Sequence, residues 1–190
     1  MILSAPIERA ADNRDPLSRQ TFLSSHRARA VLTREFARLS KQLIAAARTL
    51  AHNSLDEAPT VRQAPDHCIV QFGPVALTVG WLRNGSDSPA AGQLLAIVWR
   101  GYIAPRGEHS PERLDARRAR TAPVSAWEET LVVSAASEET WHWHPEGLTR
   151  EGYASPELAT RCIEQLRIAH HAISLEASDE ESITAGPARV

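Results

Sequence analysis

Residues 67–83 of the chain read HCIVQFGPVALTVGWLR, and this stretch decides the fold. Val75, Leu77, Val79 and Trp81 occupy alternate positions, which places large apolar side chains on one face of a strand. Gly73-Pro74 separates this run from a shorter apolar run at 67–72. So short a connection predicts an antiparallel pair, because a parallel crossover needs a dozen or more residues.

Three further strands are predicted over 93–103, 126–135 and 140–144. We assign to the same core face as Trp81 the alternating residues Leu95, Ile97 and Trp99, Leu131 and Val133, and Trp141 and Trp143. The second face is then smaller and more polar. It carries Ile69, Gln71, Thr78, Gly80, Ala96, Val98, Arg100, Tyr102, Thr130, Val132, Ser134, His142 and His144.

Amphipathic helices flank the strands. The first begins at a Ser24 or Ser25 cap and carries a stripe at Ala28, Leu32, Phe36, Leu39, Leu43, Ala46 and Leu50. The second begins at Ser155-Pro156 and carries a stripe at Ala159, Cys162, Ile163, Leu166, Ala169 and Ile173. We therefore predict an α+β fold, a single antiparallel meander of about five strands with both long helices packed on the Trp-rich face. This order of elements is similar to that of small secretion chaperones, and because one fold hosts many functions, the resemblance implies a fold alone.

The chain of 190 residues fits one domain with tails. We predict a flexible N-terminal arm at 1–23, an α+β domain at 24–174 and a disordered acidic tail at 175–190. Inside the domain, 104–125 is a basic insert, either a short helix or a disordered loop. Pro59 and Pro65 bracket a linker between the first helix and the strands.

Composition narrows the classes of function. A net charge of −2 gives no general attraction to nucleic acid or anionic membranes. Lys41 is the single lysine among many arginines and alanines, which is typical of a GC-rich, bacterial coding sequence. Cys68 and Cys162 are too few for a disulfide framework. No secretory signal is evident at the N-terminus, so we expect a cytoplasmic protein.

Two clusters of residues are candidates for binding a ligand. His142 and His144 share one face of a strand, a spacing found in metal sites, although a metal needs a third ligand that the pattern does not supply. If the insert is helical, Arg113, Arg117 and Arg120 share a face that suits phosphate or an acidic partner. No phosphate loop or catalytic motif is present.

The mixed second face of the sheet is the main candidate site. We expect a non-enzymatic protein that binds a protein partner or a second copy through it, without a cofactor, a metal or a membrane. The residues predicted to bind are Val98, Arg100, Tyr102, Val132, His142 and His144. The alternatives are a small enzyme or metal-binding protein centred on His142 and His144, and a weak nucleic-acid binder that uses the arginines of the insert.

Overall fold

The computed structural model describes residues 21–54, 58–83, 92–103, 122–135, 137–147 and 152–184. Two long helices and a sheet make up this part of the chain. The elements are α2 (His26–Ser54), β1 (Thr60–Gln63), β2 (His67–Phe72), β3 (Val75–Arg83), β4 (Gly92–Arg100), β5 (Val124–Ser134), the 3-10 turn η1 (Glu138–Thr140), β6 (His142–Pro145) and α3 (Ser155–Thr184).

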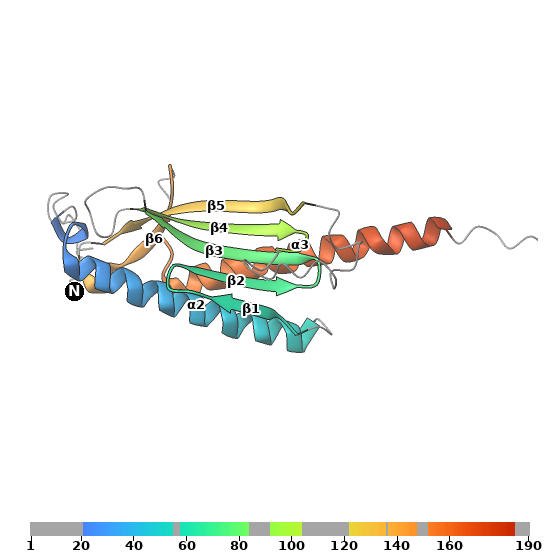
Figure 1. Cartoon of the computed structure of the whole chain (residues 1–190), viewed down its shortest axis with the longest axis horizontal. Coiled ribbons are helices and arrows are strands. Elements are labelled where there is room, and N and C mark those ends of the chain that lie inside the picture. Colours follow the sequence, from blue (N-terminus) through green and yellow to red (C-terminus); the bar gives the residue numbers. More distant parts are fainter. Residues whose placement is uncertain are drawn as a thin grey trace, which may run out of the picture.

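The sheet is an antiparallel meander whose strands lie in chain order from β1 to β6. Helices α2 and α3 pack against each other and run along the sheet (Figure 1). The predicted α+β class is confirmed. The sixth strand, β1, lies between Pro59 and Pro65, where a linker was predicted. Four residues with one β-branched pair, Thr60-Val61, are too short for a recognisable strand pattern.

A single apolar core fills the space between the helices and one face of the sheet. The indole rings of Trp81 and Trp141 meet the fully buried ring of Trp143 edge-on, with centroids 6.0 and 5.8 Å apart. Aromatic pairs favour this geometry because a positive ring edge faces a negative ring face. The helices contribute Ala28, Val31, Leu32, Phe36, Leu39, Leu43, Ala47, Leu158, Ala159, Cys162, Ile163, Leu166 and Ala169.

The face of strand β4 that contacts the helices is the opposite of the face predicted to do so. Its register pairs Trp81 with Leu94, Val79 with Ala96 and Leu77 with Val98. Leu94, Ala96 and Val98 are therefore fully buried in the core, whereas Leu95, Ile97 and Trp99 lie on the other face. Every residue from Leu94 to Trp99 is apolar, so alternation could not select a face, and pairing with β3 selects it instead.

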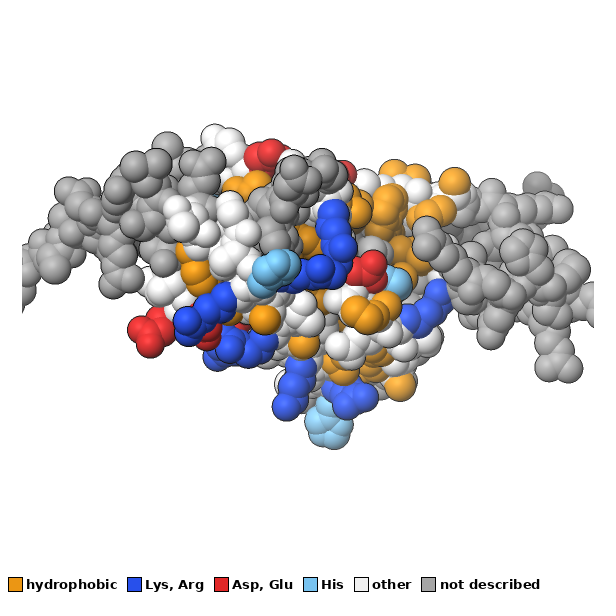
Figure 2. Space-filling view, turned by 60° about the vertical axis from the view of Figure 1, so that its left-hand side comes forward, with side chains coloured by type: hydrophobic (Ala, Val, Ile, Leu, Met, Phe, Trp, Pro, Cys, Tyr) orange, Lys and Arg blue, Asp and Glu red, His pale blue; other side chains and the backbone are white. Residues whose placement is uncertain are grey.

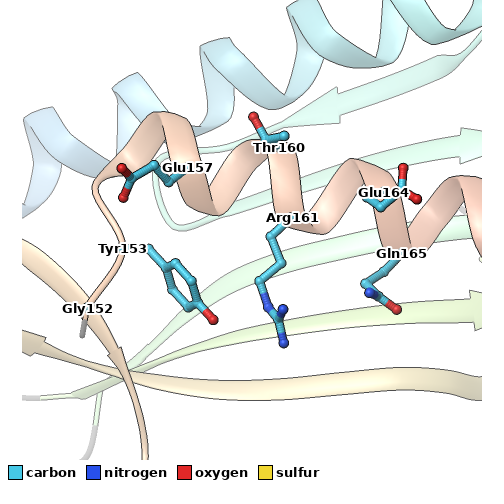
Figure 3. Close-up of a pocket in the computed structure, with 7 residues that line it drawn as sticks. All are labelled: Gly152, Tyr153, Glu157, Thr160, Arg161, Glu164 and Gln165. Carbon is cyan, nitrogen blue, oxygen red and sulfur yellow. The ribbon is translucent and has the colours of Figure 1, made fainter. Parts of the chain in front are cut away.

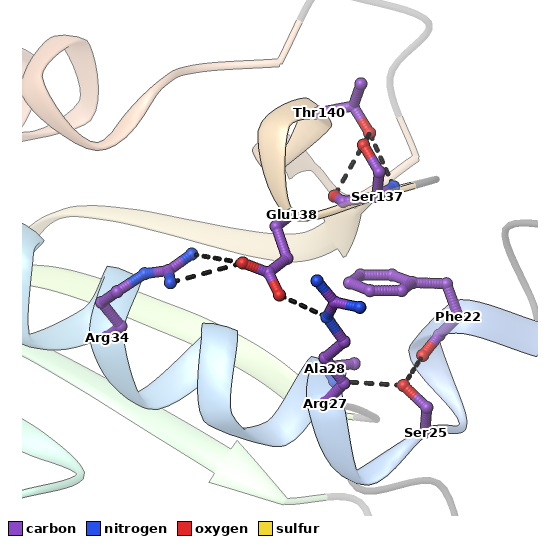
Figure 4. A network of polar contacts seen from close by, with 8 residues as sticks. All are labelled: Phe22, Ser25, Arg27, Ala28, Arg34, Ser137, Glu138 and Thr140. Carbon is purple, nitrogen blue, oxygen red and sulfur yellow. Dashed lines mark hydrogen bonds and ion pairs between the residues drawn. The ribbon is translucent and has the colours of Figure 1, made fainter.

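The start of α2 is fixed by local capping and by a clamp from the turn that precedes β6 (Figure 4). Ser25 Oγ accepts a hydrogen bond from the Ala28 amide at 3.1 Å and donates one to the Phe22 carbonyl at 2.6 Å. Glu138 of η1 binds Arg27 and, at 3.5 Å, Arg34. The turn before β6 is thereby tied to the first turns of α2.

The boundaries of the predicted arm, insert and tail fall partly outside the described residues. Helix α3 continues to Thr184, past residue 175 where the tail was predicted to begin, and its last turns project beyond the strands (Figure 1). Residues 21–23 are helical, and β5 begins at Val124, inside the predicted insert. Residues 1–20, 104–121 and 185–190 lie outside the described part.

Candidate functional site

A groove lies on the face of the sheet opposite the helices, which we call the open face. Its floor is β3, where Gly80 has no side chain and Thr78 a short one. The row through Thr78 pairs it with Ile69 on β2 and Ile97 on β4. The row through Gly80 pairs it with His67 and Leu95. Small residues on the central strand and large ones on both neighbours therefore produce a furrow along β3.

The groove has a volume of about 600 Å³ and a largely apolar lining. Its lining residues are Arg62, Asp66, His67, Ile69, Thr78, Gly80, Trp81, Leu82, Leu95, Ile97 and Ile103. Leu82 remains 52% exposed, while Ile97 is only 9% exposed at the base of the wall. Binding sites in proteins share this size and this combination of apolar walls with a few polar groups.

The segment after β4 closes one side of the groove. Gly101 adopts φ +118°, a backbone conformation suited to glycine, and its amide donates to the Pro74 carbonyl. The chain thus turns back across the sheet. The Gln71 side chain accepts from the Ile103 amide at 3.1 Å, and Arg62 Nη2 donates to the Ile103 carbonyl at 3.1 Å. These two bonds hold the Ile103 side chain at the groove.

The rim of the groove is charged. Asp66 and His67 lie side by side, with 2.9 Å between Oδ1 and Nδ1. The hydrogen bond from His67 lowers the pKa of the Asp66 carboxyl, so Asp66 is ionised at neutral pH. Arg62 stands on β1 at the end of the row that contains Ile69. A largely apolar lining with mixed charges around it resembles the anatomy of protein interfaces.

The predicted binding residues divide into three groups. Val98 faces the helices with 0% exposure, so its placement on the open face was wrong. Val132 lies opposite His144 on the open face, one strand beyond β4 and outside the groove. Arg100 lies opposite the core residue Val75, so its placement on the open face was also wrong, and half-buried Tyr102 follows the end of β4 outside the groove lining. The predicted anion-binding residues Arg113, Arg117 and Arg120 lie outside the described residues.

The two histidines are neighbours with separate environments. Their ring centroids are 6.3 Å apart. His142 Nδ1 lies 3.1 Å from the Thr140 carbonyl, which can only accept, so that nitrogen carries the hydrogen. The His144 ring lies so close to Gly152 that a Cβ there would approach Nε2 to 2.5 Å. Within the described ranges no third His, Cys, Asp or Glu joins them in a cluster able to hold a metal ion.

A second, more polar pocket of about 550 Å³ lies beside the first half of α3 (Figure 3). Arg161 extends from α3 beside the ring of Tyr153, 5.5 Å from its centroid. Its guanidinium binds both carboxylate oxygens of Glu129 at 2.8 and 3.3 Å. Because this arginine already has a carboxylate partner inside the fold, the arrangement secures α3 to β5 and is a weaker candidate for ligand binding.

Basic side chains form no continuous surface on the side of the molecule shown in Figure 2. Blue arginine and lysine side chains are interspersed with apolar and uncharged ones there. Nucleic-acid binding depends on a basic patch or stripe. The described residues on this side therefore lend the nucleic-acid alternative no support.

Several groove residues were missed by sequence reasoning. Leu95 and Ile97 were assigned to the core because β4 is apolar throughout. Arg62 was missed because its strand, β1, was not predicted. Ile103 is held at the groove by hydrogen bonds to its backbone, which no sequence pattern predicts. The available signal was the series of small residues Ala76, Thr78 and Gly80 on one face of a strand whose other face is built of large residues, which marks a hollow in a sheet face.

Comparison of the chain with protein-family models, with curated proteins and with solved structures found no match. Among the described helices, none combines the length and the apolar content that crossing a bilayer requires.

Proposed function

We propose that this protein is a non-enzymatic binding protein that associates with another polypeptide through its open sheet face. The observation that carries the proposal is the groove along β3, which leaves Ile69, Leu82 and Leu95 accessible. The other face of the same sheet is covered by two helices. An apolar furrow within an exposed sheet face favours burial against a partner, because removing apolar surface from water drives association.

The titratable residues that line the groove favour binding over catalysis. The groove contains one titratable pair, Asp66 and His67, and both side chains are substantially exposed, at 71% and 45%. Catalytic groups are usually desolvated by burial, and this pair remains in contact with solvent. Cys68 and Cys162 are buried and unpaired, which supports action in a reducing compartment such as the cytoplasm.

Site-specific photo-crosslinking in a host cell tests the proposal. A benzophenone amino acid replaces Leu95 in the groove wall, and a matched probe replaces Thr33, which is exposed on α2. We expect covalent polypeptide adducts from position 95 and none from position 33. Gly80→Glu should remove the adducts, because it places a charge in the apolar furrow that a bound polypeptide would have to cover.

The matched control is Ser134→Glu, which adds the same side chain to the open face away from the groove lining. It should leave the adducts intact. Equal adducts from both probe positions, or adducts that persist in the Gly80→Glu background, would refute the proposal.

A further inference from the structure

The open face has a charge pattern that is complementary to itself. One cross-strand row runs from Arg62 on β1 through Ile69, Thr78 and Ile97 to Glu128 on β5. Thr78 is the midpoint of this row, with an apolar residue on each side and a charge at each end. The two end charges are opposite in sign.

Within one chain these two charges cannot meet. They are four strand spacings apart, roughly 19 Å at about 4.8 Å per strand. Arg62 uses one N–H group on the Ile103 carbonyl, and Glu128 is exposed on β5. Among the described residues, the ion pairs include neither of them.

We infer that the polypeptide bound at the open face is a second copy of this chain, arranged face to face about a two-fold axis parallel to β3 above Thr78. This inference rests on the proposed function and names the partner. Rotation about that axis places the β1 half of each sheet over the β5 half of the other. It places Arg62 of each copy opposite Glu128 of the other, and both pairs form together, as a two-fold interface requires.

The charge pattern also selects this orientation. A two-fold axis perpendicular to the strands would place β1 over β1 and β5 over β5, so that Arg62 would face Arg62 and Glu128 would face Glu128. Like charges in contact across an interface are strongly unfavourable. The parallel axis instead surrounds the apolar centre, Ile69 and Ile97, with two opposite-charge pairs, and it corresponds to the aligned packing of two sheets in a sandwich.

Charge reversal tests the inference by sedimentation equilibrium. Arg62→Glu alone and Glu128→Arg alone each bring like charges together twice, and each should weaken the dimer about tenfold or more. A mixture of the two variants should form a heterodimer, because the two substituted side chains then face each other with opposite charges, and the native Arg62 of one variant faces the native Glu128 of the other. The double variant Arg62→Glu with Glu128→Arg should dimerise like the wild type.

The controls separate this inference from the proposed function. Circular dichroism establishes that each variant is folded, and Glu139→Arg, an exposed reversal on η1, should leave the dimer unchanged. A wild-type dimer that is indifferent to both single reversals overturns the inferred arrangement. A monomeric wild type whose Leu95 probe captures a different polypeptide overturns the inference and leaves the proposed function standing. A monomer without groove adducts refutes both.

Discussion

Trp143 and Trp99 differ in what surrounds them. Trp143 is fully buried, packs against two other tryptophans, and donates from Nε1 to Ser155 Oγ at 3.1 Å. Trp99 lies half-exposed on the open face and donates to Thr78 Oγ1 at 3.2 Å. The two indoles therefore remove very different areas of apolar surface from water.

Truncating these two tryptophans should have unequal effects on stability. Trp143→Ala should lower the free energy of unfolding by about 3–5 kcal/mol, because it leaves a large cavity in a packed core. Trp99→Ala should cost about 1–2 kcal/mol, in line with partial burial. Urea denaturation at low protein concentration measures both. A larger loss for Trp99 than for Trp143 would mean that the face of β4 is misassigned.

The two cysteines should be chemically inert in the folded protein. Burial raises the pKa of Cys68 to about 11 and that of Cys162 to about 12. Since the thiolate is the reactive form, neither should react with a maleimide or an aromatic disulfide at mildly alkaline pH. Both should react at once in urea. Rapid labelling of either thiol in the native protein would contradict the packing of β2 or α3.

At the scale of elements, Glu138 joins η1 to α2. Its hydrogen bond with Arg27 lowers the pKa of the carboxyl below the usual 4.5, and the charge of Arg34 acts in the same direction. A lowered pKa in the folded state means that the contact stabilises the fold above pH 4.5. That contribution is lost as the pH falls through the lowered pKa.

Replacement of this carboxylate should therefore have a pH-dependent effect. Glu138→Gln should lower the thermal midpoint near neutral pH, and the difference from wild type should shrink as the solution is acidified below pH 4.5. Glu139→Gln, its exposed neighbour, should show neither effect. A difference that stays constant from neutral to acid pH would show that the charge of Glu138 is not what stabilises this contact.

The elements differed in how well the sequence predicted them. Strand β3 alternates large apolar residues with mostly smaller ones, and both helices carry apolar stripes at helical spacing, so their buried faces were predicted correctly. Strand β4 lacks such a period, and its face depends on long-range pairing with β3. Helix α3 extends beyond Ser174 into a segment rich in acidic residues and without a continuous apolar stripe, where sequence pattern indicated a tail.

For the candidate site, the sequence pointed to the face of the sheet that carries the groove and to few of the residues that line it. The open face, Ile69, Thr78 and Gly80 were recognised from alternation. The hollow itself depends on cross-strand neighbours, because Ile69 and Ile97 become its walls only once the register places them beside Thr78. Register is a property of paired strands, so a single strand's pattern does not contain it.

At the scale of the whole molecule, the described residues form a sheet with helices on one face and a groove on the other. The helix-covered face provides the core, and the groove is where we propose that a second copy of the chain binds. Gly80 is central to this account, since a Cβ there would lie 3.8 Å from its nearest neighbours, the Asp66 carbonyl oxygen and the His67 Cβ. The glycine is therefore not required by the fold, and a side chain there would enter the groove.

Sedimentation equilibrium of the Gly80→Glu variant tests this account most directly. A Cβ has ordinary van der Waals room at this position, so the thermal midpoint should change little. In the inferred dimer the axis places position 80 of one copy opposite position 80 of the other, so two carboxylates would meet in an apolar interface. The wild type should therefore sediment as a dimer of the 20.9 kDa chain, whereas Gly80→Glu should sediment as a folded monomer over the same concentrations. A folded Gly80→Glu variant that dimerises as tightly as the wild type would contradict the claim that the open face is where this protein associates.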